Sequence, residues 1–146
     1  MLSQFLSRLL APQPQTLPDE DARLALTALL VRLARSDGDY APAEIARIDR
    51  IAQARFGLTE HEAQALRTQA EAVEAEAPDT HRFTLAIKEA VPYDDRLGIV
   101  TALWEVVLAD GVREAEEDAL VRMVSSFLGV SDRDSARARQ RAEREG

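Results

Sequence analysis

Two short segments of the chain, residues 37–44 and 110–117, carry carboxylates at a spacing that could bind a cation. Each begins with Asp-Gly and ends with a Glu six residues after the glycine. The second half of an EF-hand calcium loop has this spacing, because the glycine allows a sharp bend and the Glu supplies a bidentate carboxylate. The first half of such a loop is missing, since the positions four and two residues before each Asp are apolar or basic: Leu33 and Arg35, and Val106 and Leu108.

The two segments together hold more of the oxygen ligands that a hard cation needs. Ca²⁺ takes six to eight oxygens, which is more than one segment offers. Two segments that meet could pool their carboxylates with backbone carbonyls and water. We expect Ca²⁺ first, because flexible all-oxygen sites suit it, and Mn²⁺ or Mg²⁺ next. The predicted ligands are Asp37, Glu44, Asp110 and Glu117, with Asp39 and Glu114 as outer contributors.

A structural role for the same residues is an open alternative of comparable weight. Glycine commonly ends a helix, and acidic residues at a helix start interact favourably with the helix dipole. A Glu in the first turn of a helix can also cap that helix itself. The two segments are therefore consistent with a shared cation site and with ordinary helix ends.

Both segments belong to a longer internal duplication. Asp-Ala-Arg-Leu at 21–24 and Asp-Asp-Arg-Leu at 94–97 lie 73 residues apart, the same offset as the two Asp-Gly pairs. Further along, Gly-Leu-Thr at 57–59 and Gly-Val-Ser at 129–131 match one residue out of this register. A duplicated helical unit suggests two related elements packed face to face. That packing would bring the two acidic turns near each other.

Apolar residues recur at helical spacing along most of the chain, and strand signals are lacking. Gly38 and Gly57 are expected to end helices, and Thr59 with Glu62 to form a capping box. We predict an all-α fold with a single domain of about seven to eight helices, built from two pseudo-symmetric repeats. Its expected parts are a short N-terminal helix with a Pro/Gln linker at 1–18 and a helical domain at 19–146, which comprises repeat one at 19–76, a connecting helix at 78–91 and repeat two at 92–145.

The two ends of the chain have distinctive compositions. Residues 1–11 have the spacing of a short amphipathic helix, which we expect to fold onto the body; contact with a membrane surface or a partner is the alternative. Residues 132–145 contain five arginines and four acids, so the last helix is interpreted as a solvated surface helix.

Several single residues also have expected places. Arg23 and Arg96 occupy equivalent positions in the two repeats and are expected to pair with nearby acids. Phe83 and Trp104 fall on apolar stripes and are expected in the core.

The composition excludes several classes of function. A formal net charge of −8 opposes binding to the phosphates of nucleic acid. Residues 94–118 alone hold eight carboxylates and two arginines, so this region attracts cations or basic partners. The chain has no cysteine, which removes disulfides and thiolate ligands and fits a cytoplasmic location. No apolar run of about 18 residues is present, so no membrane span is expected.

No constellation of residues predicts catalysis. A ferritin-like di-iron centre requires Glu-x-x-His motifs, but Leu58 and Pro78 stand three residues before His61 and His81. The pattern of a catalytic triad and a glycine-rich phosphate loop are both missing. We therefore expect a protein that is not an enzyme and holds no organic cofactor.

The sequence around the two turns resembles the tellurite-resistance protein B (TerB) family over residues 20–140. The resemblance rests on Ala-Arg-Ser-Asp-Gly-Asp-Tyr-Ala-Pro-Ala-Glu at 34–44, on Leu-Ala-Asp-Gly at 108–111, and on the flanking residues 93–97 and 117–118. It implies an all-helical, mostly bacterial, cytoplasmic protein whose acidic turns are linked to divalent-cation binding and to a stress response. Matched to that motif, the acidic positions are Asp37, Glu44, Asp110 and Glu117.

The second turn departs from the first. Val112 and Arg113 stand where the first turn has Asp39 and Tyr40, so the second turn has lost an acid and gained a base. We therefore do not expect the two turns to contribute equally to cation binding.

The resulting hypothesis is a TerB-like stress-response protein with a weak divalent-cation site or an acidic docking surface at its duplicated turns. The alternative is a helical adaptor that binds a protein partner, near a membrane through residues 1–11, without a metal. A protein partner of unknown identity is expected.

Overall fold

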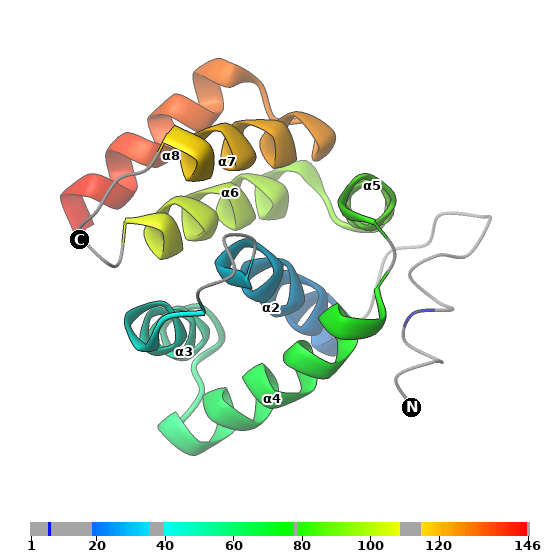
Figure 1. Ribbon diagram of the computed structural model, residues 1–146, viewed down its shortest axis with the longest axis vertical. Coiled ribbons are helices and arrows are strands. Elements are labelled where there is room, and N and C mark those ends of the chain that lie inside the picture. Colours follow the sequence, from blue (N-terminus) through cyan, green and yellow to red (C-terminus); the bar gives the residue numbers. More distant parts are fainter. Residues whose placement is uncertain (1–5, 7–18, 36–39, 78, 109–114, 146) are drawn as a thin grey trace.

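The computed structural model of the chain describes residues 6, 19–35, 40–77, 79–108 and 115–145. These residues form helices and no strand (Figure 1). The predicted all-α fold is confirmed. The helices are α2 (Asp19–Arg35), α3 (Pro42–Phe56), α4 (Glu60–Glu76), α5 (Thr80–Ala90), α6 (Tyr93–Val107), α7 (Ala115–Phe127) and α8 (Asp132–Glu145).

The helices form two groups of three, joined by α5. In the first group α2 packs along α4 and against α3, and in the second group α6 packs along α8 and against α7. The first helices of the two groups, α2 and α6, also pack on each other in the middle of the molecule (Figure 1). The predicted pair of pseudo-symmetric repeats is confirmed, because corresponding helices pair in the same way.

The helix ends follow the signals in the sequence. The predicted capping box is formed: the amide of Glu62 donates to the Thr59 hydroxyl at 3.1 Å, and the amide of Thr59 donates to the Glu62 carboxylate at 2.9 Å. Gly57 and Gly129, which follow α3 and α7, have φ angles of 65° and 75°. Glycine adopts this left-handed region without the steric cost that a Cβ brings, which explains why both helices end there.

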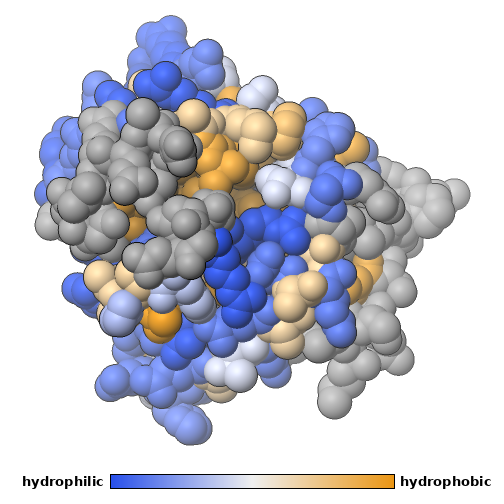
Figure 2. All heavy atoms as spheres, in the orientation of Figure 1, coloured by the Kyte–Doolittle hydropathy of each residue, from blue (hydrophilic) through white to orange (hydrophobic). Residues whose placement is uncertain are grey.

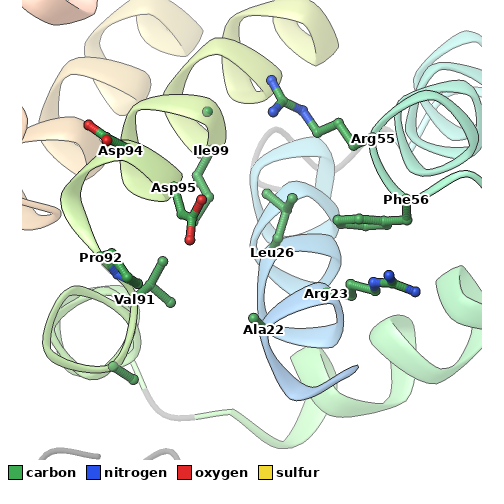
Figure 3. Close-up of a pocket in the computed structure, with 12 residues that line it drawn as sticks. Ala22, Arg23, Leu26, Arg55, Phe56, Val91, Pro92, Asp94, Asp95 and Ile99 are labelled. Carbon is green, nitrogen blue, oxygen red and sulfur yellow. The ribbon is translucent and has the colours of Figure 1, made fainter. Parts of the chain in front are cut away.

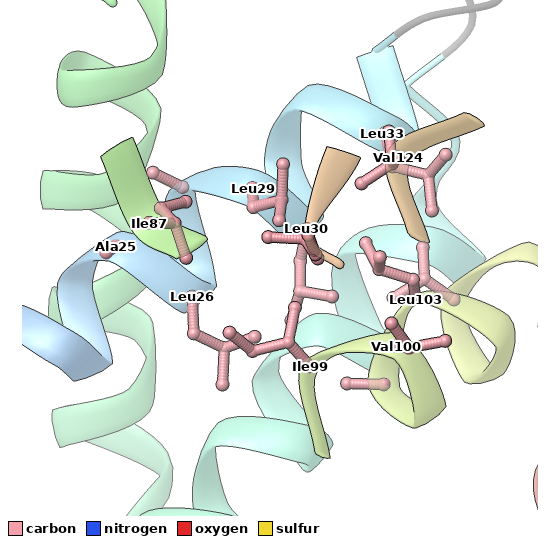
Figure 4. Close-up of a cluster of buried hydrophobic side chains, with 14 of the residues drawn as sticks. Ala25, Leu26, Leu29, Leu30, Leu33, Ile87, Ile99, Val100, Leu103 and Val124 are labelled. Atoms are coloured by element: carbon pink, nitrogen blue, oxygen red, sulfur yellow. The ribbon is translucent and has the colours of Figure 1, made fainter. Parts of the chain in front are cut away.

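The core lies between α2 and α6 and extends to α5 and α7. Leu26, Leu29 and Leu30 of α2 are buried, as are Ile99 and Leu103 of α6, and Figure 4 shows the two rows facing each other. Positions three and four residues apart share one face of a helix, so each row is a continuous apolar stripe. The expected burial of Phe83 and Trp104 is also confirmed.

The interpretation of the last helix as a solvated surface helix is wrong for one of its faces. Ser135, Ala138 and Ala142 of α8 are buried, and α8 packs along α6. Small side chains three and four residues apart form a narrow stripe that lets two helices approach closely. The balance of charges in this segment described the opposite, exposed face.

The expectation that Arg23 and Arg96 pair with acids is also wrong within the described residues. Arg96 donates to the backbone oxygens of Val91 at 3.0 Å and Leu128 at 2.5 Å. The Arg23 guanidinium lies over the ring of Phe56, 5.3 Å from its centroid. Backbone carbonyls and an aromatic ring take the place of the expected carboxylates.

Polar side chains cover most of the described surface on the face drawn in Figure 2, with apolar residues in small groups between them. None of the helices in the described part of the chain is long and apolar enough to cross a membrane. Leu6 is partly buried and packs against the core. The other residues of the helix expected at 1–11 lie outside the described residues, so that helix stays a prediction.

Candidate metal centre

Glu44 is the predicted ligand whose side chain the structure describes. Two segments with acidic turns, 36–39 and 109–114, lie outside the described residues, and they contain Asp37, Asp39, Asp110 and Glu114. The backbone of Glu117 lies in the first turn of α7, while its side chain is outside the described part. The pooling of the four carboxylates therefore stays a prediction.

Glu44 caps the helix in which it lies. Its side chain is buried, with 5% of the residue exposed, and its Oε1 accepts a hydrogen bond from the amide of Ala41 at 3.2 Å. The carbonyl of Ala41 in turn accepts from the amides of Glu44 and Ile45, at 3.0 and 3.1 Å. These bonds satisfy an amide that is otherwise unpaired at a helix start. The structural alternative is thus confirmed for Glu44.

Capping and cation binding are compatible roles for this carboxylate. The cap engages Oε1, whereas an ionised carboxylate has two oxygens and about four acceptor positions. The bond to Ala41 fixes the direction of the side chain, and the start of α3 favours its negative charge through the helix dipole. Glu117 is likewise the third residue of its helix, so the two glutamates occupy equivalent backbone positions.

The described helix ends beside the two turns lie together. Arg47, about one helical turn after Glu44, lines a pocket of about 230 Å³ with Glu105 and Leu108 of the second repeat. Leu108 directly precedes the segment 109–114. The start of α3 and the end of α6 therefore face each other at one end of the molecule. A site shared by the two turns requires this arrangement.

The described side chains do not complete a metal site without the turns. Among them, no group of three or more His, Asp or Glu could hold a metal ion. A site at this end of the molecule would have to take its remaining oxygens from residues 36–39 and 109–114.

Polar contacts fix both flanks of the first turn to α4. Before the turn, Arg35 pairs with Glu74 at 2.8 Å. After the turn, the Tyr40 hydroxyl donates to Oε2 of Glu71 at 2.8 Å. The Arg35 guanidinium lies 5.2 Å from the centre of the Tyr40 ring. Burial raises the pKa of Tyr40, and the hydrogen bond to the Glu71 carboxylate raises it further. Tyr40 therefore stays protonated and remains a donor at neutral pH.

Arg67 extends this network to α3. Its Nη1 lies 3.0 Å from the Glu71 carboxylate and its Nε lies 2.7 Å from the Asp49 carboxylate. The spacing of Arg67 and Glu71 by four residues is a sequence signal for a local pair on a helix. Sequence reasoning missed the rest of the network, because Asp49 and Tyr40 reach α4 only through the packing of separate helices.

Comparison with known proteins identifies one family. The sequence model of the family described as "Tellurite resistance protein TerB" matches residues 23–140 of the chain. No curated protein and no solved structure gives a match.

Proposed function

The chain belongs to the TerB family, and we propose that it is a non-enzymatic, cytoplasmic stress-response protein whose two acidic turns together bind one divalent cation. Ca²⁺ is the proposed ion, ahead of Mn²⁺ and Mg²⁺, because a flexible all-oxygen site suits it best. The proposed ligands are Asp37, Glu44, Asp110 and Glu117, and Asp39 and Glu114 add negative charge around them.

One observation carries the proposal: the start of α3 and the end of α6 lie together around Arg47, Glu105 and Leu108. The first of these helix ends holds Glu44, and the second leads directly into the turn with Asp110. Two turns held at one end of the molecule could share an ion that neither could bind alone.

The first turn should contribute more than the second. Its flanking residues Arg35 and Tyr40 are anchored to α4 by the contacts with Glu74 and Glu71. The second turn has Arg113 at the position equivalent to Tyr40, and a cation is repelled by that base. Loss of Asp37 should therefore weaken ion binding more than loss of Asp110.

Thermal unfolding with chelator and with millimolar CaCl₂ tests the proposal. An ion present at about ten times its Kd raises the free energy of unfolding by about 1.4 kcal/mol. For a domain of this size, that corresponds to a rise in Tm of about 3–5 °C. We expect this rise in the wild type and its loss in the double variant Asp37→Ala, Asp110→Ala.

Two variants make the test specific. Glu76→Ala with Glu89→Ala removes two exposed carboxylates and changes the net charge equally, so it should keep the response to Ca²⁺. Glu44→Gln retains an oxygen that can cap Ala41 but loses the charge, so it should fold and respond weakly. An equal rise in Tm in the wild type and the double variant, or no rise in either, would refute the ion site and favour the adaptor function.

A further inference from the structure

A second candidate site lies between the repeats. A pocket of about 550 Å³ opens between the first half of α2, the end of α3 and the start of α6 (Figure 3). Its apolar wall includes Leu26, Phe56 and Ile99. Its charged residues are Arg23 and Arg55 on α2 and α3, and Asp94 and Asp95 on α6. Pockets of this size that combine an apolar wall with a few polar groups are typical of small-molecule sites.

The pocket lies far from the acidic turns, because the helices that line it run away from them. Arg23 at the pocket precedes the end of α2 by twelve residues, which is about 18 Å along a helix. Arg55 follows Glu44 by eleven residues in α3, or about 16 Å. A ligand here would therefore not share residues with the proposed cation site.

The internal duplication shows how the pocket became polar. Leu26 and Ile99 occupy equivalent positions 73 residues apart and form the two sides of an apolar wall. One helical turn earlier, the equivalent positions are Ala22 on α2 and Asp95 on α6. A carboxylate is therefore present at this level on the α6 side only. The two sides of the pocket therefore differ in charge although their apolar parts correspond.

A positive charge enters from the opposite side. Arg55 reaches from α3 toward α6, and a Cβ on Gly98 would lie 2.8 Å from its Nη1, so the guanidinium occupies the space that a side chain at this position would take. The residue of the first repeat equivalent to Gly98 is Ala25. Figure 3 shows the Arg55 side chain extending from α3 toward α6, and Asp95 pointing into the space between α6 and α2.

The two charges do not neutralise each other. Within the described residues, neither Arg55 nor Asp95 forms an ion pair within 4.0 Å. Both residues line the pocket and are exposed. Gly98, next to the guanidinium, and Asp95 are three residues apart on α6, so about 5 Å of helix separates their positions. An extended dipeptide spans at most about 7 Å, which is longer than this rise along the helix.

We propose that this pocket binds a small zwitterion with an apolar body, and that a short apolar peptide with free ends represents the class. Its ammonium group pairs with Asp95, its carboxylate pairs with Arg55, and its side chains lie on Leu26, Phe56 and Ile99. A purely anionic ligand would be repelled by Asp95, and a purely cationic ligand by Arg55. Asp94 beside Asp95 and Arg23 on α2 have the same signs as these two residues on their respective sides, so the charges of the pocket select both the class of ligand and its direction.

Titration of the ¹⁵N-labelled full chain with the dipeptide Leu-Leu tests this proposal. We expect saturable chemical-shift changes at the amides of Leu26, Gly98 and Ile99. N-acetyl-Leu-Leu and Leu-Leu-amide each lack one charge and should bind about threefold to fivefold more weakly, as expected for one exposed ion pair. The titration is performed in chelator, so its outcome is independent of the proposed cation site.

Charge variants assign each end of the probe. Asp95→Asn should bind Leu-Leu and its acetylated form equally, and Arg55→Gln should bind Leu-Leu and its amide equally. Glu76→Gln and Arg50→Gln change exposed residues that do not line the pocket, and they should behave like the wild type. The proposal is overturned if Leu-Leu causes no saturable shifts at these amides, or if blocking either end leaves the wild-type affinity unchanged.

Discussion

Arg96 near the start of α6 donates a hydrogen bond from Nη1 to the backbone oxygen of Leu128, 2.5 Å away, just after the end of α7. The last carbonyls of a helix have no partner within it, and a cation there also interacts favourably with the helix dipole. A Cβ on Gly129 would lie 2.9 Å from the same Nη1. The glycine that ends α7 therefore also makes room for the arginine that caps it.

The first repeat contains the corresponding pair of positions. Arg23 is equivalent to Arg96, and Phe56 is equivalent to Leu128 when both are counted back from the glycines that follow them. Arg23 lies over the ring of Phe56, so the arginine meets the same position through a side chain instead of a carbonyl. The duplication thus preserves which helix ends meet and changes the chemistry of the contact.

Arg96→Gln should destabilise the protein more than Arg23→Gln. The first change removes charge-assisted hydrogen bonds to two backbone carbonyls, and a hydrogen bond to a charged group contributes about 1.5–3 kcal/mol. The second removes a stacking contact worth about 0.5–1 kcal/mol. Urea unfolding of both variants measures the difference. An equal loss in the two variants would show that the carbonyl bonds contribute little to the stability of the α6–α7 pair.

The fold could be predicted from sequence because its signals are local. The duplicated motifs at 21–24 and 94–97 indicated two related repeats, and the Thr59 capping box marked the start of α4. The packing face of α8 was missed for a physical reason: its stripe consists of Ser135, Ala138 and Ala142, which carry little hydropathy among many arginines. The balance of charged residues in a segment therefore does not indicate that its helix packs through a stripe of small side chains.

The candidate site could be predicted only in part. Spacing alone located Glu44 at the start of a helix and indicated that it could cap that helix, which the bond to Ala41 confirms. Contacts between separate helices could not be predicted in this way. The bond from Tyr40 to Glu71 spans 31 residues, and the bond from Arg96 to Leu128 ends on a backbone atom that every residue type provides. The described flanks of the turns came together through packing of the same kind.

Tyr40→Phe should destabilise the protein by about 0.5–1.5 kcal/mol at pH 7, because it removes the hydrogen bond to Glu71. The pKa of Tyr40 is raised in the folded protein above the ordinary value of 10.0. The folded state therefore holds the proton more tightly, and this contribution is complete below pH 10 and is lost as pH rises above it.

The free energy of unfolding of the wild type and Tyr40→Phe should be compared at pH 7, 9 and 11. Their difference should be constant from pH 7 to 9 and shrink at pH 11. A difference that stays the same at pH 11 would contradict the contribution from the raised pKa. Tyr93→Phe should show a change with pH in the same direction, because the hydrogen bond from the Tyr93 hydroxyl to Asp134 also raises the pKa of Tyr93.

Glu62 should stabilise the start of α4 only while it is ionised. Its pKa is lowered from the ordinary value of 4.5, first by the hydrogen bond from the backbone amide of Thr59 and then by the bond from the Thr59 side chain. A lowered folded pKa gives stability that is present above about pH 4.5 and is lost as pH falls through the folded value. Chemical unfolding from pH 7 to 3 should therefore show the wild type and Glu62→Gln converging at the acid end. Parallel curves over that range would contradict this role.

Thr59→Ala removes the other half of the same capping box and should cost about 1 kcal/mol. The amide of Glu62 loses the hydroxyl acceptor that lies 3.1 Å away. The pKa of Glu62 is lowered from 4.5, so Glu62 is ionised at both pH 7 and pH 5 and the effect should be similar at the two values. Thr68→Ala is a suitable control, because the Thr68 hydroxyl bonds a carbonyl within the same helix. A cost as small as that of the control would show that α4 does not depend on this cap.

Ser135→Ala should be among the most destabilising small changes in the second repeat. The buried indole Nε1 of Trp104 donates to the Ser135 hydroxyl at 3.2 Å, and this hydroxyl lies 3.3 Å from that of Ser125. Ser125 donates to the carbonyl of Val121 at 2.7 Å, so it must accept from Ser135. The three side chains therefore form one directed chain of hydrogen bonds between α6, α8 and α7.

Removing the middle member of this chain leaves the indole donor buried without a partner, at a cost of about 1–3 kcal/mol. Ser125→Ala leaves the bond from Trp104 to Ser135 in place, so it should cost less. In the double variant Trp104→Phe, Ser135→Ala no donor remains to be satisfied, and the combined loss should be smaller than the sum of the two single losses. Thermal unfolding of the four proteins gives the coupling directly. Strict additivity would mean that the hydrogen bond does not couple α8 to α6, and that the buried alanines alone hold the two helices together.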